Sequence, residues 1–248
     1  DKKIKPKYLN KAIEYLNENR QKIQNPMNIK DVKVDENLFN LKDEKNLLKT
    51  IFRKIKIKNE ILDYSERISF LRILKNYFYK KKNILDMKFY KFDKLEHLEN
   101  FVFLPLQHEP ETIGMCNPVF DNQFETARII SRNLPKNYCL AVKIHPFRSY
   151  YKSKKFMDKF KNCPNIKIIS HKVPNEKIFK KMNCLVSFSG TAIFEAAILK
   201  KPAVQIGNMQ LMKNLPNIFF LEKLQEIDQV INKLENSFQD YADSKSYD

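Results

Sequence analysis

The sequence predicts an α/β protein, with a Rossmann-like parallel sheet that has helices on both faces and follows a mainly helical N-terminal segment. From residue 100 onward, apolar runs of four to seven residues alternate with helical patterns. This alternation is typical of right-handed βαβ crossovers around a parallel sheet. Before residue 100 the apolar residues recur at helical spacing instead, as in Leu47, Leu48, Ile51 and Ile55, which favours helices that pack one face against a core.

Each element can be placed from its own apolar pattern. Strands are expected at 101–106, 138–144, 166–170, 184–188, 203–206 and 217–221, and helices at 120–132, 153–161, 175–181, 191–199 and 222–234. The N-terminal segment is expected to contain helices near 8–16, 47–55 and 68–78, with a loop over 26–40. The expected parts of the chain are therefore a helical segment over 1–99, a sheet domain over 100–237 and a polar tail over 238–248.

Composition narrows the class of protein. Hydrophobic residues make up 43% of the 248 residues, which is enough for a buried core and excludes a disordered chain.

The cysteines Cys116, Cys139, Cys163 and Cys184 form no CxxC pair, so we expect neither a zinc site nor a disulfide framework, in keeping with a cytoplasmic location. No signal peptide and no apolar run of about 20 residues is visible. The chain opens at Asp1 without a methionine, so we expect a piece of a longer protein.

The net charge of +17 is spread along the chain. A basic surface attracts nucleic acid, an anionic membrane or anionic substrates, but lysines on ordinary solvated faces give the same composition. We expect no nucleic-acid binding, because neither an aromatic stacking platform nor a known binding motif accompanies the charge. The segment Arg53–Lys82 is densely basic. It either holds the protein near the inner face of the cell membrane or is ordinary surface, and the sequence leaves both interpretations open.

A histidine follows the expected strand over 138–144. The apolar run Leu140–Ile144 leads directly into His145 and Pro146. Proline ends the strand and stiffens the turn, which fixes the imidazole at the carboxyl edge of the sheet. A histidine there can donate to a phosphate or assist a leaving group, with a packing or capping role as the alternative. Lys143 lies two residues earlier and shares the face of His145 if the strand is regular.

The sharpest local pattern follows the expected strand over 184–188. Ser189, Gly190 and Thr191 open a helix that contains Glu195. The glycine lets the backbone approach a ligand closely, and the free N–H groups of a helix start favour an anion. Glu195 lies one turn further, where a carboxylate can accept hydrogen bonds from a ribose diol. An ordinary N-cap followed by a solvent-facing glutamate is the alternative.

A third polar cluster follows the expected strand over 101–106. It begins Gln107, His108, Glu109 and has an ordinary polar loop as its alternative. Ligands of open parallel sheets bind beyond the carboxyl ends of the strands, so we expect the three clusters to face one cleft. Asp121 is expected to cap the next helix. No closely spaced carboxylate pair follows a strand, so the sequence predicts no metal and no cofactor.

The order of these motifs resembles one known family. The series FVFLPLQHEPET, FDNQ, LAVKIHP and LVSFSGTAIFEAAILKKPAVQIG resembles the capsule polysaccharide biosynthesis proteins, over about residues 100–210. That family includes transferases that use CMP-activated Kdo and is distantly similar to bacterial sialyltransferases. The resemblance implies a GT-B glycosyltransferase whose C-terminal domain holds most of the donor nucleotide. Residues 1–99 would then be a remnant of the acceptor domain.

The resemblance also implies roles for particular residues. His145 and Glu109 are the catalytic candidates, and the candidates for donor-nucleotide binding are Lys143, His145, Pro146, Ser189, Gly190, Thr191, Glu195 and Gln107. The implied reaction moves a sugar from a CMP-activated donor to a surface polysaccharide, lipopolysaccharide or glycolipid acceptor. Two other functions stay open: a CDP-linked glycerol- or polyol-phosphate transferase of similar fold, and a non-catalytic basic binding protein.

Overall fold

A computed structural model describes residues 11, 14–15, 17–18, 41–56, 70–107, 122–144, 153–188, 191–206, 217–221 and 223–232. The chain groups into two compact units. One unit contains the sheet and comprises residues 1–32, 92–146 and 158–248. The other comprises residues 33–91 and 147–157 and contains the two long helices α2 (Leu41–Lys56) and α3 (Phe70–Lys88).

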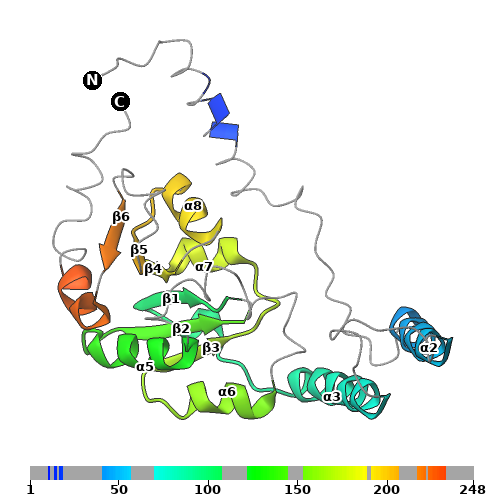
Figure 1. Ribbon diagram of the computed structural model, residues 1–248. Helices are drawn as coiled ribbons and strands as arrows, with labels where there is room; N and C mark the ends of the chain where they lie inside the picture. The colour runs from blue at the N-terminus through cyan, green and yellow to red at the C-terminus, as the bar shows by residue number, and fades with distance from the viewer. Residues whose placement is uncertain are drawn as a thin grey trace. The chain divides into compact units, whose positions relative to one another are not determined.

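The sheet unit is built on six parallel strands (Figure 1). They are β1 (Phe101–Pro105), β2 (Cys139–Lys143), β3 (Ile166–Ile169), β4 (Cys184–Ser187), β5 (Ala203–Ile206) and β6 (Ile218–Leu221). Their order across the sheet is β3-β2-β1-β4-β5-β6. This is the doubly wound order, in which the chain reverses its direction of travel across the sheet between β1 and β4.

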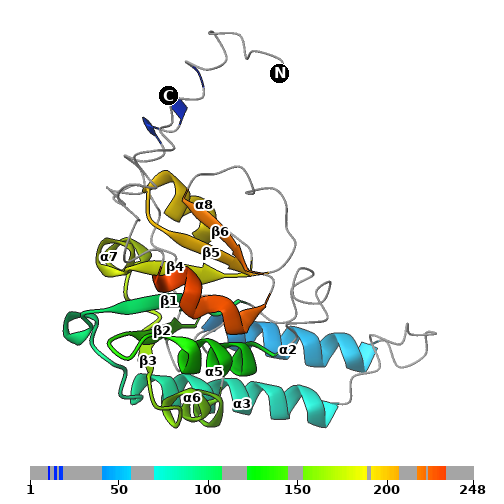
Figure 2. The ribbon, with the colours of Figure 1, turned by 90° about the vertical axis from the view of Figure 1, so that its left-hand side faces the viewer.

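The four central strands β2, β1, β4 and β5 are buried on both faces, so their sequences are mostly apolar rather than alternating. On one face the core packs beneath α7 (Asn175–Lys181) and α8 (Thr191–Ile198), which contribute Ile178, Phe179 and Ile193. On the other face α5 (Gln123–Asn133) packs against β2 and β3 and against the turn η7 (Leu224–Glu226). Figure 2 gives a second view of these layers.

Local interactions fix the ends of the sheet elements. The side chain of Asn122 caps α5 by accepting hydrogen bonds from the N–H groups of Phe124 and Glu125. The edge strand β3 is covered by the segment that precedes η3 (Leu95–His97). There Asp93 donates its N–H to the Ile168 carbonyl at 2.9 Å and accepts the Ile168 N–H on its carboxylate at 2.7 Å. This pairing removes an open strand edge.

The predicted fold class is confirmed by the structure. All six strands lie within one or two residues of their expected bounds. The expected helix at 120–132 begins later, at Gln123, with Asn122 rather than Asp121 as its cap. The expected closing helix over 222–234 begins instead as η7 and continues as α-helix over 227–232. The expected division at residues 99 and 237 stays a prediction, and the expected loop over 26–40 and the polar tail fall outside the described residues.

The helical character expected for the N-terminal segment is confirmed in α2 and α3. The structure extends both helices well beyond the stretches 47–55 and 68–78 that the sequence indicated. The hydroxyl of Tyr77 on α3 donates to Glu44 on α2 at 3.5 Å, and Lys81 lies 3.9 Å from the same carboxylate. Within the described part of the chain, neither these helices nor any other is long and apolar enough to cross a lipid bilayer.

Candidate functional site

The strand order itself indicates where a ligand would bind. In doubly wound sheets the crevice lies beyond the carboxyl ends of the two strands that flank the reversal point, here β1 and β4. Gln107 follows the end of β1, and α8 begins at Thr191, a few residues after the end of β4. Gln107 and the first residue of α8, Thr191, therefore lie in the chain next to the reversal point, and Lys143 ends β2, which pairs directly with β1.

Polar side chains occupy the last row of the sheet on the face covered by α7 and α8. Lys143, Ser187 and Gln205 each lie two residues after a core residue on that face, namely Ala141, Leu185 and Ala203. Ser187 is level with Gln205, and Pro105 is level with Lys143. All three polar side chains are buried, with exposed fractions of 6%, 1% and 2%. A polar row at the carboxyl edge of an otherwise apolar sheet marks this edge as the candidate site.

Lys143 is the best-defined charged group of the site. Its Nζ donates to the Val173 carbonyl and to Asn175 Oδ1, both at 2.6 Å. These bonds fix the turn that leads into α7. Burial lowers the pKa of Lys143 to about 8, and the negative charge of Glu195 on α8 opposes this lowering. Lys143 therefore bonds directly to the start of α7 and is also influenced by the charge of Glu195 on α8.

We expect the buried lysine to leave a signature in the pH dependence of stability. The folded chain releases the Lys143 proton near pH 8, whereas the unfolded chain holds it to about pH 10.4. Between these values the unfolded state binds more protons, so the free energy of unfolding rises with pH, by up to about 3 kcal/mol. Comparing urea unfolding of wild type and Lys143→Met from pH 7 to 10.5 isolates this contribution, because the other lysines are common to both. A difference that stays constant with pH would contradict it.

Gln107 is positioned through its backbone. Its N–H donates to Gln123 Oε1 at 2.6 Å, and Gln123 Nε2 donates back to the Gln107 carbonyl at 3.1 Å. Gln123 is the first residue of α5 and is buried. This reciprocal pair attaches the exit of β1 to the start of α5, so the chain leaves the sheet next to the reversal point in a fixed direction.

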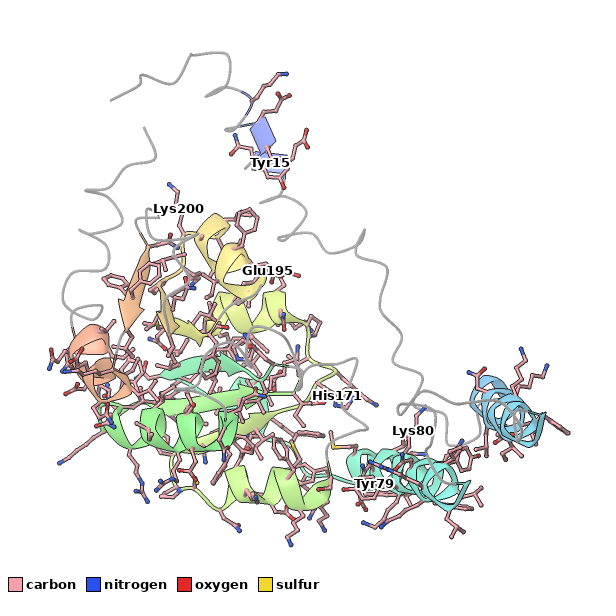
Figure 3. All side chains as sticks on the ribbon, in the orientation of Figure 1. Tyr15, Tyr79, Lys80, His171, Glu195 and Lys200 are labelled. Carbon is pink, nitrogen blue, oxygen red and sulfur yellow. The ribbon has the colours of Figure 1, made fainter. Side chains whose placement is uncertain are left out.

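The structure describes only part of the expected site. Glu195 is half-buried on α8, where Figure 3 marks it, and Gln107 and Lys143 are described as above. The backbone of Thr191 begins α8, but its side chain lies outside the described residues. Glu109, His145, Pro146, Ser189 and Gly190 also lie outside the described residues. Their assignment stays a prediction.

Several residues at this edge escaped the sequence analysis. The side-chain oxygen of Asn175 accepts a hydrogen bond from the Lys143 ammonium. The side-chain oxygen Oε1 of Gln205 is buried without a hydrogen-bond partner among the residues that the structure describes. His171, marked in Figure 3, lies in the turn that follows β3 and packs edge-to-face against Phe92, with ring centroids 6.0 Å apart. For His171, its position just after an expected strand was the one sequence feature that could have indicated a place in the site. Ser187 and Gln205 sit within apolar runs and gave none.

No known protein family and no curated protein matches the sequence. Solved structures are similar over part of their length. They include UDP-GlcNAc 2-epimerase from Neisseria meningitidis bound to UDP-GlcNAc (TM-score 0.40, 16% identity, 69% of this chain and 44% of that one). A putative UDP-N-acetylglucosamine 2-epimerase from Listeria monocytogenes gives a TM-score of 0.45 at 15% identity, over 67% of this chain and 46% of that one. The wall teichoic acid polymerase TagF gives a TM-score of 0.42 at 14% identity, over 68% of this chain and 40% of that one.

The chain thus spans less than half the length of each of these proteins. Structural similarity at such low sequence identity concerns the fold alone. The fold of this chain is assigned from the strand order of its own sheet, not from these similarities. In the described part of the chain no group of histidine, cysteine, aspartate or glutamate side chains could hold a metal ion. The described cysteines Cys139, Cys163 and Cys184 are free thiols.

Proposed function

We propose that this chain is the donor-binding half of a GT-B glycosyltransferase that uses a nucleotide-activated sugar, with a CMP-linked sugar as the favoured donor. The observation that supports this most is the reversal point between β1 and β4, which the polar exits of both strands flank. The CMP preference rests on the motif resemblance to capsule polysaccharide biosynthesis proteins. The acceptor in this proposal is a surface polysaccharide or glycolipid.

In the proposed site, positive groups offset the charge of the donor phosphate. The Lys143 ammonium and the helix start at Thr191, where the first N–H groups have no partner within the helix, both favour an anion at this edge. Two of the three Lys143 hydrogens are engaged by Val173 and Asn175, which leaves one for a ligand. Glu195 would accept hydrogen bonds from the ribose. His145 would then act on the leaving phosphate and Glu109 on the acceptor side.

A nucleotide panel tests the proposal. We expect CMP at 100 times its dissociation constant to raise the free energy of unfolding by about 2.7 kcal/mol, which is readily seen as a thermal shift. CDP, UDP and GDP at equal concentration are the matched comparisons. A shift with UDP or GDP but not CMP would remove the CMP preference and keep the nucleotide site. A shift with CDP alone would favour a CDP-linked polyol-phosphate donor. No shift with any of the four would contradict the proposed function for this chain.

A further inference from the structure

Helix α3 presents two apolar faces rather than one. One face contains the buried residues Ile84 and Met87. Leu71, Phe78, Leu85 and Phe89 are exposed instead, with exposed fractions of 76%, 66%, 43% and 74%. Large apolar side chains scattered singly over a surface need no explanation, but a contiguous group of them marks an interaction site.

The exposed residues lie along one line of the helix. The exposed Leu71, Phe78, Leu85 and Phe89, together with the half-buried Leu74, are hereafter the α3 stripe; in chain order its members are separated by three, four, seven and four positions. At 3.6 residues per turn, these intervals return to the same side of a helix. The helical backbone continues to the last of them, because the Phe89 N–H donates to the Leu85 carbonyl at 3.3 Å. The stripe therefore runs the length of α3.

Positive charge borders the α3 stripe. The helix has six basic residues and one acidic residue, Asp86, which pairs with Lys82 at 3.1 Å. By helical spacing, Lys75 and Lys82 fall beside the stripe on one side and Lys88 falls on the other, whereas Lys81 is turned to Glu44 of α2. Tyr79 and Lys80, both marked in Figure 3, lie further around the helix from the stripe. An apolar line bordered by lysines matches the depth profile of an anionic bilayer surface, with acyl chains below and phosphates at the level of the charges.

We propose that the α3 stripe and its bordering lysines form a docking surface for an anionic lipid bilayer, with α3 lying in the plane of the interface. Charge complementarity selects this occupant over a second copy of the chain, because pairing two stripes would bring two identical rows of lysines together. The docking surface lies wholly on α3 and needs no nucleotide. Membrane binding can therefore be tested separately from the proposed transferase function.

Flotation with lipid vesicles tests this surface. The full chain should float with vesicles that contain roughly a third phosphatidylglycerol and should bind pure phosphatidylcholine vesicles about tenfold less, with the difference shrinking at high salt. Phe78→Ser combined with Phe89→Ser should reduce binding to anionic vesicles by about tenfold or more. Both side chains are exposed, so the melting temperature of this variant should stay within about 2 °C of wild type.

A matched pair of charge variants separates a local site from overall charge. Lys75→Gln with Lys82→Gln should weaken binding several-fold, whereas Lys136→Gln with Lys172→Gln, which removes the same charge from exposed positions of the sheet unit, should not. Equal losses in both variants would overturn the proposal in favour of nonspecific charge. Absence of binding to anionic vesicles would also overturn it, as would a dimer in sedimentation that Phe78→Ser with Phe89→Ser abolishes.

Discussion

Replacing Lys143 by methionine should weaken nucleotide binding by about a thousandfold while leaving the free energy of unfolding at neutral pH nearly unchanged. The lost binding, about 4 kcal/mol, is typical of removing one buried member of a hydrogen-bonded charge pair. Methionine matches the length of the lysine stem, so the packing beneath α7 is retained. The binding is measured by calorimetry with the nucleotide that stabilises the wild type most.

The substitution makes one stabilising and one destabilising contribution to the free energy of unfolding, and these explain why the fold should tolerate it. A pKa lowered to about 8 means that the folded state disfavours the ammonium by about 3 kcal/mol, and methionine removes that penalty. Methionine also leaves the Val173 carbonyl and Asn175 Oδ1 without their donor, and because both residues are only partly buried the two losses together cost about 1–3 kcal/mol. The two contributions nearly cancel. A buried charge that adds little to stability is explained if it serves a ligand.

Lys167→Met is the matched control. Lys167 lies on the neighbouring strand β3 but is exposed, so the same substitution there should change neither binding nor stability by more than about 0.5 kcal/mol. If Lys143→Met binds nucleotide as the wild type does but loses more than about 3 kcal/mol of the free energy of unfolding, the lysine serves only to hold α7 in place. That result would contradict its role in the nucleotide site.

The strands were predictable from the sequence because both faces of the sheet are buried. Runs such as Leu140–Val142 or Phe101–Leu104 are apolar without interruption, and such runs are typical of parallel strands covered on both sides. The strand order was not predictable. It depends on which neighbours pair across crossovers, as β1 does with β4, and no local pattern records that choice.

The site was predictable where a polar residue directly follows an apolar run. Lys143 was identified by its position two residues before His145 on the same expected face of the strand, and the structure shows that it feels the charge of Glu195, another predicted residue. Asn175 and Gln205 were missed because their place in the site depends on tertiary contacts. Asn175 reaches Lys143 across more than thirty positions of chain, and Gln205 is two positions beyond a core alanine in an ordinary-looking strand.

Replacing Phe103 by alanine should cost about 3–5 kcal/mol of the free energy of unfolding. Phe103 is fully buried in the middle of β1 and packs edge-to-face on Phe179 of α7, with ring centroids 6.2 Å apart. Alanine removes the apolar surface and leaves a cavity, and the aromatic pair adds about 0.5–1.5 kcal/mol to the loss. The change is measured as a shift in the urea midpoint at constant slope.

The position of Phe103 links this loss to the candidate site. β1 leads directly to Gln107 at the reversal point, and Phe103 is level with Leu185 of β4 across that point. Phe89→Ala is the matched control, because the same ring is removed from a side chain that is 74% exposed, and its effect should stay below about 0.5 kcal/mol. Phe103→Leu should recover more than half of the stability lost in Phe103→Ala, since leucine refills most of the cavity. Equal effects of Phe103→Ala and Phe89→Ala would mean that β1 is not the centre of the core, and the placement of the site at its carboxyl end would fall with it.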